Sequence, residues 1–164
     1  MKDRFDLRVA TASQQACDNY VAGVDLLLSA NPGADERLAA AIAADPEFAL
    51  AHIARARLFQ LQARMPEARQ AAARAQALSN RASTREARHI DTIALAVAGS
   101  AAEALAAVRA HALEYPRDAL PLSLALGVFG LLGFSGRIDH HEAQLALLQE
   151  LAPFWGDDWW FLGY

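Results

Sequence analysis

The chain has 164 residues, a formal net charge of −4 and a hydrophobic fraction of 54%. This length is enough to bury a hydrophobic core within one domain. The negative net charge argues against a nucleic-acid-binding protein. Alanine supplies much of the hydrophobic fraction, and it favours helix while filling little core volume, so the composition predicts an all-α fold with closely spaced helices.

Three features of the sequence bear on its compartment. The single cysteine, Cys17, has no partner for an intrachain disulfide, so nothing favours an oxidising compartment. Residues 1–6 lack the apolar core of a secretory signal and include acidic residues that transit peptides avoid. The apolar stretch 119–134 is shorter than the roughly 20 residues of a membrane-spanning helix and contains Pro121 and Ser123. We therefore expect a cytoplasmic protein without a membrane segment.

Prolines, glycines and capping residues divide the chain into helices joined by short turns. The predicted helices, in chain order, are residues 13–30, 34–44, 49–63, 66–80, 83–98, 100–115, 118–132 and 139–152. Pro66 suits a first helical turn, where its missing N–H takes away no hydrogen bond. Ser83 and Glu86 have the capping-box spacing, in which hydroxyl and carboxylate each accept from a free amide at the helix start. Ser100 and Glu103 repeat that spacing.

Helices joined by short turns are expected to be antiparallel neighbours. The sequence predicts an N-terminal lead-in at residues 1–12 and one helical domain at residues 13–164. The predicted pairs within this domain are residues 13–45, 49–79, 83–115 and 118–152, followed by an incomplete repeat at 157–164. Several such pairs in succession favour a stacked array over a closed bundle.

Small residues recur near the middle of the first helix of each predicted pair. They are Ala22, Ala56, Ala94, Gly127 and Gly163, separated by 34, 38, 33 and 36 positions. These intervals lie close to the period of roughly 34 residues that is typical of tetratricopeptide repeats. Trp159, Leu162 and Gly163 also reproduce the Trp-x-x-Leu-Gly opening of that repeat. The chain therefore resembles a tetratricopeptide repeat protein, although Asp18 and His52 stand where the repeat has Trp.

In the order of its segments the chain also resembles the tetratricopeptide repeat protein 38 family. The closest pieces are residues 44–52, 85–89, 115–118 and the Trp-rich end. The resemblance implies a longer parent protein. It also implies a tetratricopeptide-like α-solenoid of about four antiparallel helix pairs plus the start of a fifth.

The resemblance further implies that the first helix of each pair lines a concave partner-binding surface. Carried onto this chain, the exposed positions are Asn19, Tyr20, Ile53, Arg57, Gln60, Arg88, Asp91 and Thr92. Arg57 and Arg88 would present two guanidinium groups on adjacent repeats, which favours an acidic peptide because guanidinium binds carboxylate through two parallel hydrogen bonds. The alternative is a solvated face whose arginine side chains only cover Ala-rich helices.

The histidines form no predicted metal or catalytic site. Adjacent His140 and His141 point about 100° apart on a helix, and Leu145 stands where a zinc-protease helix needs its second His. We interpret the residues 139–142 as a helix start with a capping Asp and exposed imidazoles. His52, His89 and His111 are isolated in the sequence, so each is expected to pack or to lie at the surface. We predict no enzyme activity, no metal and no cofactor.

These expectations favour an interaction module for a protein or peptide partner, without nucleic acid or membrane. One alternative is an accessory repeat domain of an enzyme whose catalytic part lies beyond residue 164. Another is RNA binding through the arginine-rich band between residues 55 and 88. The chain stops one residue after Gly163, which should stand in mid-helix, and we expect two tryptophans to be exposed there. This predicts either a piece of a longer array or pairing with another copy through the Trp-rich end.

Overall fold

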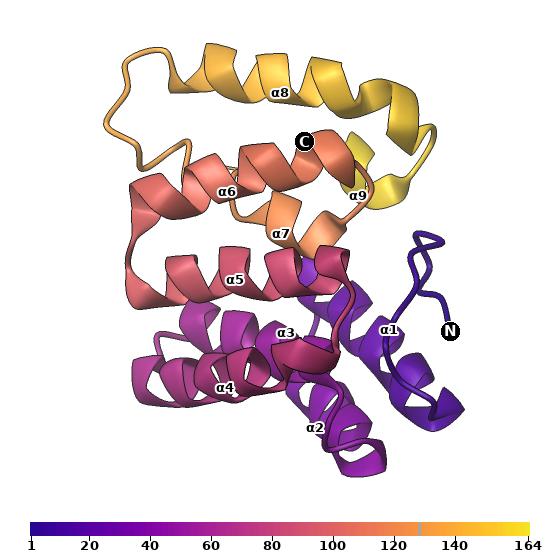
Figure 1. Cartoon of the computed structure of the whole chain (residues 1–164). Helices are drawn as coiled ribbons and strands as arrows, with labels where there is room; N and C mark the ends of the chain where they lie inside the picture. Colours follow the sequence, from indigo (N-terminus) through magenta and orange to yellow (C-terminus); the bar gives the residue numbers. More distant parts are fainter. Residues whose placement is uncertain (128) are drawn as a thin grey trace.

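The predicted all-α fold is confirmed by a computed structural model, which describes residues 1–127 and 129–164. Secondary structure in these residues is helical apart from one isolated antiparallel bridge between Lys2 and Arg8. The elements, shown in Figure 1, are α1 (Gln14–Leu28), α2 (Ala34–Ala44), α3 (Ala49–Leu61), α4 (Met65–Leu78), the 3₁₀ turn η1 (Ser79–Arg81), α5 (Thr84–Ala98), α6 (Ala101–Glu114), α7 (Ala119–Ser123), α8 (His140–Trp155) and α9 (Trp159–Leu162).

Helices α1 to α6 form three hairpins that pack on one another in chain order. Helix α1 packs against α2, α3 against α4 and α5 against α6, and α2–α3 and α4–α5 contacts join the hairpins. The helix ends agree with the predicted ranges to within a few residues. Helices α5, α6 and α8 lie one above another in Figure 1. No helix in the described part of the chain has the length and apolarity that a membrane span requires.

Local capping explains where several helices begin. Ser83 and Glu86 form the predicted capping box of α5, with the Ser83 amide donating to Glu86 Oε2 at 2.9 Å. Asp158 caps α9 by accepting from the amides of Trp160 and Phe161. The second predicted capping box is wrong, because the Ser100 side chain makes no capping hydrogen bond at the start of α6.

Helices α1 and α2 pack closely at Gly23, one position after the predicted Ala22. A Cβ atom at Gly23 would lie 2.8 Å from Leu38 Cγ, and Leu38 is fully buried. Ala22 is only half-buried. Ala56 has the predicted environment, with no exposed surface, whereas Ala94 is half-buried. Small residues thus permit close helix packing, but not all at the predicted positions.

The predicted seventh helix, residues 118–132, is wrong for the described part of that range. Helix α7 ends at Ser123, and Leu131 N donates to Leu124 O at 2.7 Å across the turn that follows. Gly127 has a φ of 78°, in the left-handed region that glycine adopts readily and that no α-helix contains. Gly127 therefore cannot serve as the mid-helix residue of a fourth repeat. Residue 128 lies outside the described residues.

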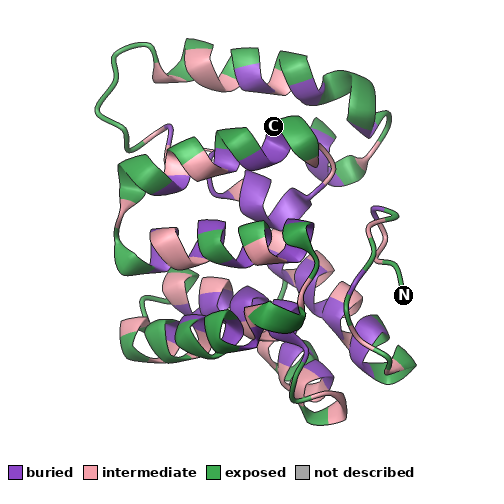
Figure 2. Ribbon diagram, in the orientation of Figure 1, coloured by how far each residue is buried: buried purple, intermediate pink, exposed green. Residues whose placement is uncertain are grey.

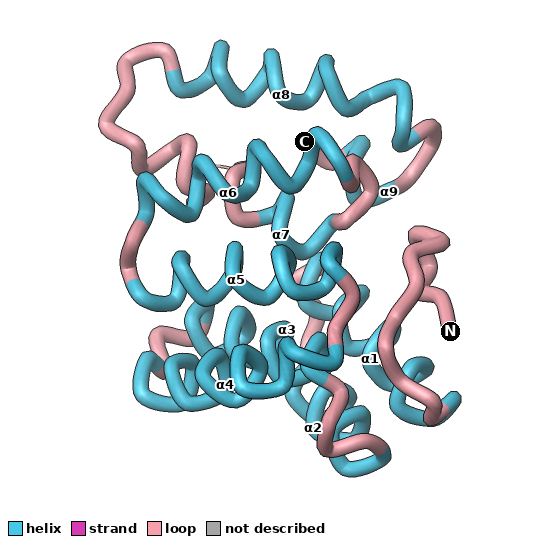
Figure 3. The backbone as a smooth tube through the Cα atoms, in the orientation of Figure 1, coloured by secondary structure: helices cyan, strands magenta, loops and turns pink. Residues whose placement is uncertain are grey.

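Helix α8 differs from the prediction at its C-terminal end. It continues through Pro153 to Trp155, where a joint was expected after residue 152. Its buried residues are Leu147, Leu151 and Trp155, and most of its remaining surface is exposed, as Figure 2 shows. The non-helical residues 129–139 lead into it (Figure 3).

The N-terminal lead-in is a packed part of the structure. Phe5 and Val9 are buried, and Arg4 forms ion pairs with Asp25 of α1 and Asp158 at the start of α9, at 2.6 and 2.7 Å. The N-terminal segment therefore contacts the start of α9, which lies near it in Figure 1.

The expectation of two exposed tryptophans at the C-terminal end is wrong. Trp155 and Trp160 are both 3% exposed, and only Trp159 remains half exposed. The Phe5 ring contacts the Trp155 ring edge-on at 5.4 Å between centroids. The N-terminal segment thus covers part of the surface on which a second copy was expected to pair.

Candidate binding groove

A groove of about 330 Å³ lies where α1, α3, the turn after α7 and the C-terminal segment meet. We call it the Arg57 groove. Its lining consists of Leu27, Leu28, Ala30, Arg57, Leu61, Ser123, Leu126, Gly127, Phe129, Trp160 and Tyr164. Arg57 is the one charged residue in this lining, and most of the others are apolar. A ligand in the groove would therefore meet hydrophobic walls and a single positive charge.

Neighbouring side chains hold Arg57 in place without neutralising it. Its Nη1 donates to Gln60 Oε1 at 2.7 Å, and Gln60 Nε2 donates to the Ala96 carbonyl oxygen of α5 at 2.8 Å. Its Nε is buried without a hydrogen-bond partner. Among residues 1–127 and 129–164, no carboxylate forms an ion pair with Arg57. Burial lowers the pKa of Arg57 to about 10, so the side chain stays charged at neutral pH.

The positive charge of Arg57 determines which kind of ligand the groove can bind. A guanidinium that is partly removed from water and has no anionic partner is unfavourable, because its desolvation is not offset by pairing. A carboxylate entering the groove would supply the missing acceptor through charge-assisted hydrogen bonds. The groove can therefore bind an anionic group whose neighbouring atoms are apolar.

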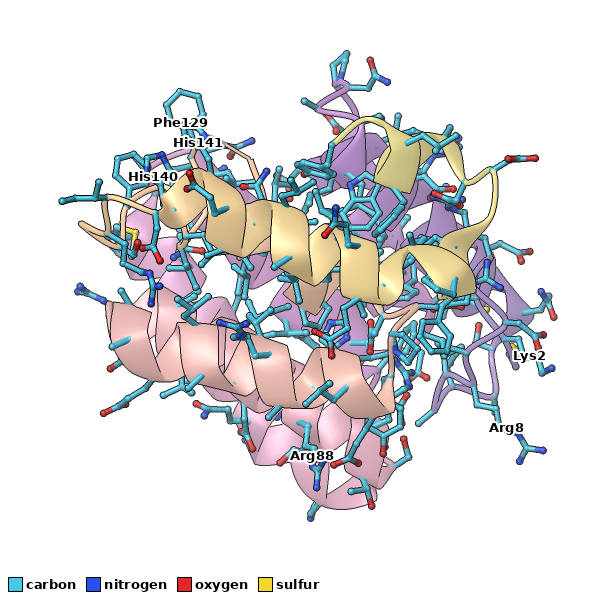
Figure 4. All side chains as sticks on the ribbon, turned by 90° about the horizontal axis from the view of Figure 1, so that it is seen from above. Lys2, Arg8, Arg88, Phe129, His140 and His141 are labelled. Atoms are coloured by element: carbon cyan, nitrogen blue, oxygen red, sulfur yellow. The ribbon has the colours of Figure 1, made fainter. Side chains whose placement is uncertain are left out.

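The C-terminal segment and the turn after α7 build the outer wall of the groove. A Cβ atom at Gly127 would lie 3.3 Å from Tyr164 Cε1, so the two segments are closely apposed. Phe129 and Leu61 have 82% and 55% of their surface exposed. Figure 4 shows Phe129 beside His140 and His141, on the opposite side of the molecule from Arg88.

Of the predicted partner-binding residues, Arg57 and Gln60 lie together at the groove. Arg88 is exposed and pairs with Glu114, and Asp91 is exposed on the same helix α5. Asn19 is half-buried, and its Oδ1 accepts from Arg37 Nη1 at 3.3 Å. Arg88 therefore does not line the groove that contains Arg57.

The expectation of an exposed surface position is also wrong for Tyr20, Ile53 and Thr92. Their exposed fractions are 3%, 0% and 2%. Each faces the core because the helix to which it belongs packs against neighbours on that side. Counting positions from the repeat pattern does not resolve these rotations, since one residue turns a side chain by about 100°.

A buried polar cluster, which the sequence did not reveal, joins α5, α6 and the start of α7. Its members are Arg85, His89, His111 and Asp118, each at most 8% exposed. The Asp118 carboxylate accepts from Arg85 Nη1 at 2.6 Å. It also lies 3.0 Å from both His89 Nδ1 and His111 Nε2. His89 and His111 occupy buried packing positions, one of the two outcomes expected, but they also share the Asp118 carboxylate, which their separation in the sequence did not indicate.

Asp118 is ionised in this cluster. Its burial acts to raise its pKa, but His89, His111 and Arg85 together hold the pKa well below its ordinary value of 3.8. The cavity beside Asp118 holds only about 10 Å³, room for a single water. No substrate can enter a space of that size, so we assign the cluster a structural role. The i,i+4 spacing of Arg85 and His89 was the one sequence signal for it.

His140 and His141 stand next to each other and line a separate cavity of about 210 Å³. The rings of His140 and His141 lie 4.0 Å apart at the start of α8, and Asp139 pairs with Arg137. Within the described residues, no group of three or more His, Cys, Asp or Glu side chains is arranged to hold a metal ion.

Comparisons of the chain with protein-family models, curated proteins and solved structures gave no match. The resemblance to tetratricopeptide repeats therefore depends on the spacing of small residues and on the succession of helical hairpins. Function has to be argued from the groove itself.

Proposed function

We propose that the protein is an interaction module of the tetratricopeptide kind, which binds a peptide or protein partner in the Arg57 groove. The observation that carries this proposal is a half-buried arginine, with no carboxylate partner among the described residues, in the lining of a largely apolar groove. Charged groups that lose much of their contact with water are normally paired, because desolvation is otherwise not compensated. An unpaired charge of this kind is expected where a ligand supplies the partner.

The position of the groove supports the same proposal. Helices α1 and α3, the first members of two successive hairpins, contribute Leu27, Leu28 and Arg57 to its lining. In the tetratricopeptide repeats that the chain resembles, such first helices form the concave, partner-binding side of the array. Since the buried Asp118 cluster admits no substrate, we place the function in binding and propose no catalytic step. The buried, unpaired Cys17 suits a reducing compartment such as the cytoplasm.

A display selection tests this proposal. A library of random peptides is selected on the immobilised protein, on a Ser123→Trp variant and on an Ala77→Trp variant. Ser123 lines the groove, so the indole should fill it, whereas Ala77 is exposed on α4 and outside the groove. We expect peptides to be enriched on the protein and on Ala77→Trp, but not on Ser123→Trp.

Two outcomes would contradict the proposal. One is a protein that enriches no peptide above the bare support. The other is equal enrichment by the Ser123→Trp variant, which would place binding elsewhere on the molecule. Circular dichroism of both variants should show the helical content of the parent protein, so that loss of binding reports on the groove.

A further inference from the structure

Resting on the proposed function, we infer which chemistry the Arg57 groove selects. The groove recognises a peptide through one acidic side chain next to one large apolar side chain. The carboxylate pairs with Arg57, and the apolar side chain packs against the exposed surfaces of Phe129 and Leu61 in the groove lining.

The count of charges at the groove limits the ligand to one anchoring carboxylate. Among the described residues that line the groove, Arg57 is the one cation and none is acidic. Arg88, the second arginine expected at this surface, is already paired with Glu114. A second acidic side chain on the peptide would therefore find no partner inside the groove and would stay in water.

Arg57 is pre-oriented for this contact. Arg57 Nη1 donates to Gln60, and Gln60 donates to the Ala96 carbonyl. These two hydrogen bonds fix the orientation of the guanidinium before a ligand binds. A side chain that is held before binding loses less conformational entropy when the ligand arrives. The geometry therefore favours a short-range, charge-assisted contact over diffuse attraction between surfaces.

The size of the groove indicates that side chains enter it and the peptide backbone does not. About 330 Å³ corresponds to roughly ten water molecules at about 30 Å³ each. Backbone amides that enter a dry groove need hydrogen-bond partners. The Ser123 hydroxyl already donates to the Leu120 carbonyl, at 2.6 Å. We therefore assign the carboxylate to an Asp or Glu side chain and not to the C-terminal end of a chain.

Substitutions at Arg57 and Leu61 test the inference with the peptides selected on the parent protein. Arg57→Met removes the charge and keeps an unbranched side chain. Leu61 lies one helical turn after Arg57 on α3 and is 55% exposed, so Leu61→Glu places an internal carboxylate beside the guanidinium. Leu61→Gln is the matched neutral control.

The binding measurement is a fluorescence-anisotropy titration with labelled peptides. On the parent protein, replacing the peptide's acidic residue by its amide should weaken binding about ten- to a hundredfold, the range for hydrogen bonds to charged groups. On Arg57→Met the same replacement should change affinity by less than about twofold, because the two changes remove one shared contact. Leu61→Glu should lower the affinity for the acidic peptide, and Leu61→Gln should leave that affinity unchanged.

Three results would overturn the inference. The selected peptides could lack an acidic residue. The amide replacement could lower affinity equally for the parent protein and for Arg57→Met, or amidation of the peptide's C-terminus could be the change that lowers affinity. In each case Ser123→Trp still tests the groove, so the proposed function would stand if that variant alone loses binding. If no peptide is selected at all, both the inference and the proposed function are wrong.

Discussion

The region from α1 to α6 and the region from α7 onward use small residues in different ways. In the first region, Ala56 and Gly23 lie inside helices and allow neighbouring helices to approach. In the second, Gly127 and Gly136 adopt positive φ angles and end or connect helices. A repeat of small residues therefore specifies helix packing only where the surrounding segment is helical, as it is around Gly23 and Ala56 and is not around Gly127.

The two regions also differ in how much apolar surface they bury. Ile53, Leu38 and Ile90 in the first region are completely buried. Phe129, Phe134 and Ile138 in the second are 82%, 72% and 100% exposed. The stable hairpins thus act as a base on which the second region builds the wall of the Arg57 groove.

The largest expected effect on stability comes from substituting Asp118, whose contacts join the two regions. Asp118→Asn should lower the free energy of unfolding by about 3–5 kcal/mol, because the buried Arg85 guanidinium loses the charge of its carboxylate partner. Urea denaturation measures this change. Glu114→Gln, which breaks an exposed pair with Arg88, is the control and should change stability far less. Equal losses in the two variants would show that the cluster does not stabilise the junction.

Acid should weaken the same junction. The folded pKa of Asp118 lies well below 3.8, its ordinary value, so its stabilising contribution is complete above that value and is lost as the pH falls toward the folded pKa. Stability measured between about pH 5 and pH 2 should therefore fall more steeply for the parent protein than for Asp118→Asn. Parallel curves would contradict an ionised Asp118.

A smaller effect is expected within the first region. Gly23→Ala places a Cβ atom 2.8 Å from Leu38 Cγ, and the enclosed Leu38 side chain has little room to move. We expect the free energy of unfolding to fall by about 1–3 kcal/mol, the usual penalty of overpacking. The better helix propensity of alanine offsets only part of this penalty. Thermal denaturation provides the measurement. A stabilised variant would show that the α1–α2 contact is looser than the structure indicates.

The smallest effect concerns local opening of α8. Its amides should exchange with solvent at least about tenfold faster than those of α3, because elements with few buried contacts open at low free energy. The α8 contacts come from Leu147, Leu151 and Trp155, beside a groove of about 250 Å³ against α6. Hydrogen exchange followed by mass spectrometry compares the two helices. Equal protection would mean that both regions unfold as one unit.

Much of the helical framework could be predicted from sequence. Helix starts are marked in the sequence by the pair Ser83 and Glu86 and by Asp158. They can be recognised there because capping is a contact between residues three or fewer positions apart. Of the candidate site, the sequence identified Arg57 and Gln60, which lie one helical turn apart. It could not identify Trp160 or Tyr164 as groove walls, because these residues reach Arg57 only through the folding of the C-terminal segment.

The sequence by itself determined the all-α class and the order of the first six helices, since alanine content, capping and punctuation act over short distances. Only the tertiary structure decided that His89, His111 and Asp118 share one cluster and that Arg57 is left without a carboxylate. The rotation of each helix about its axis sets those contacts. That rotation follows from packing among all neighbours, which no local pattern specifies.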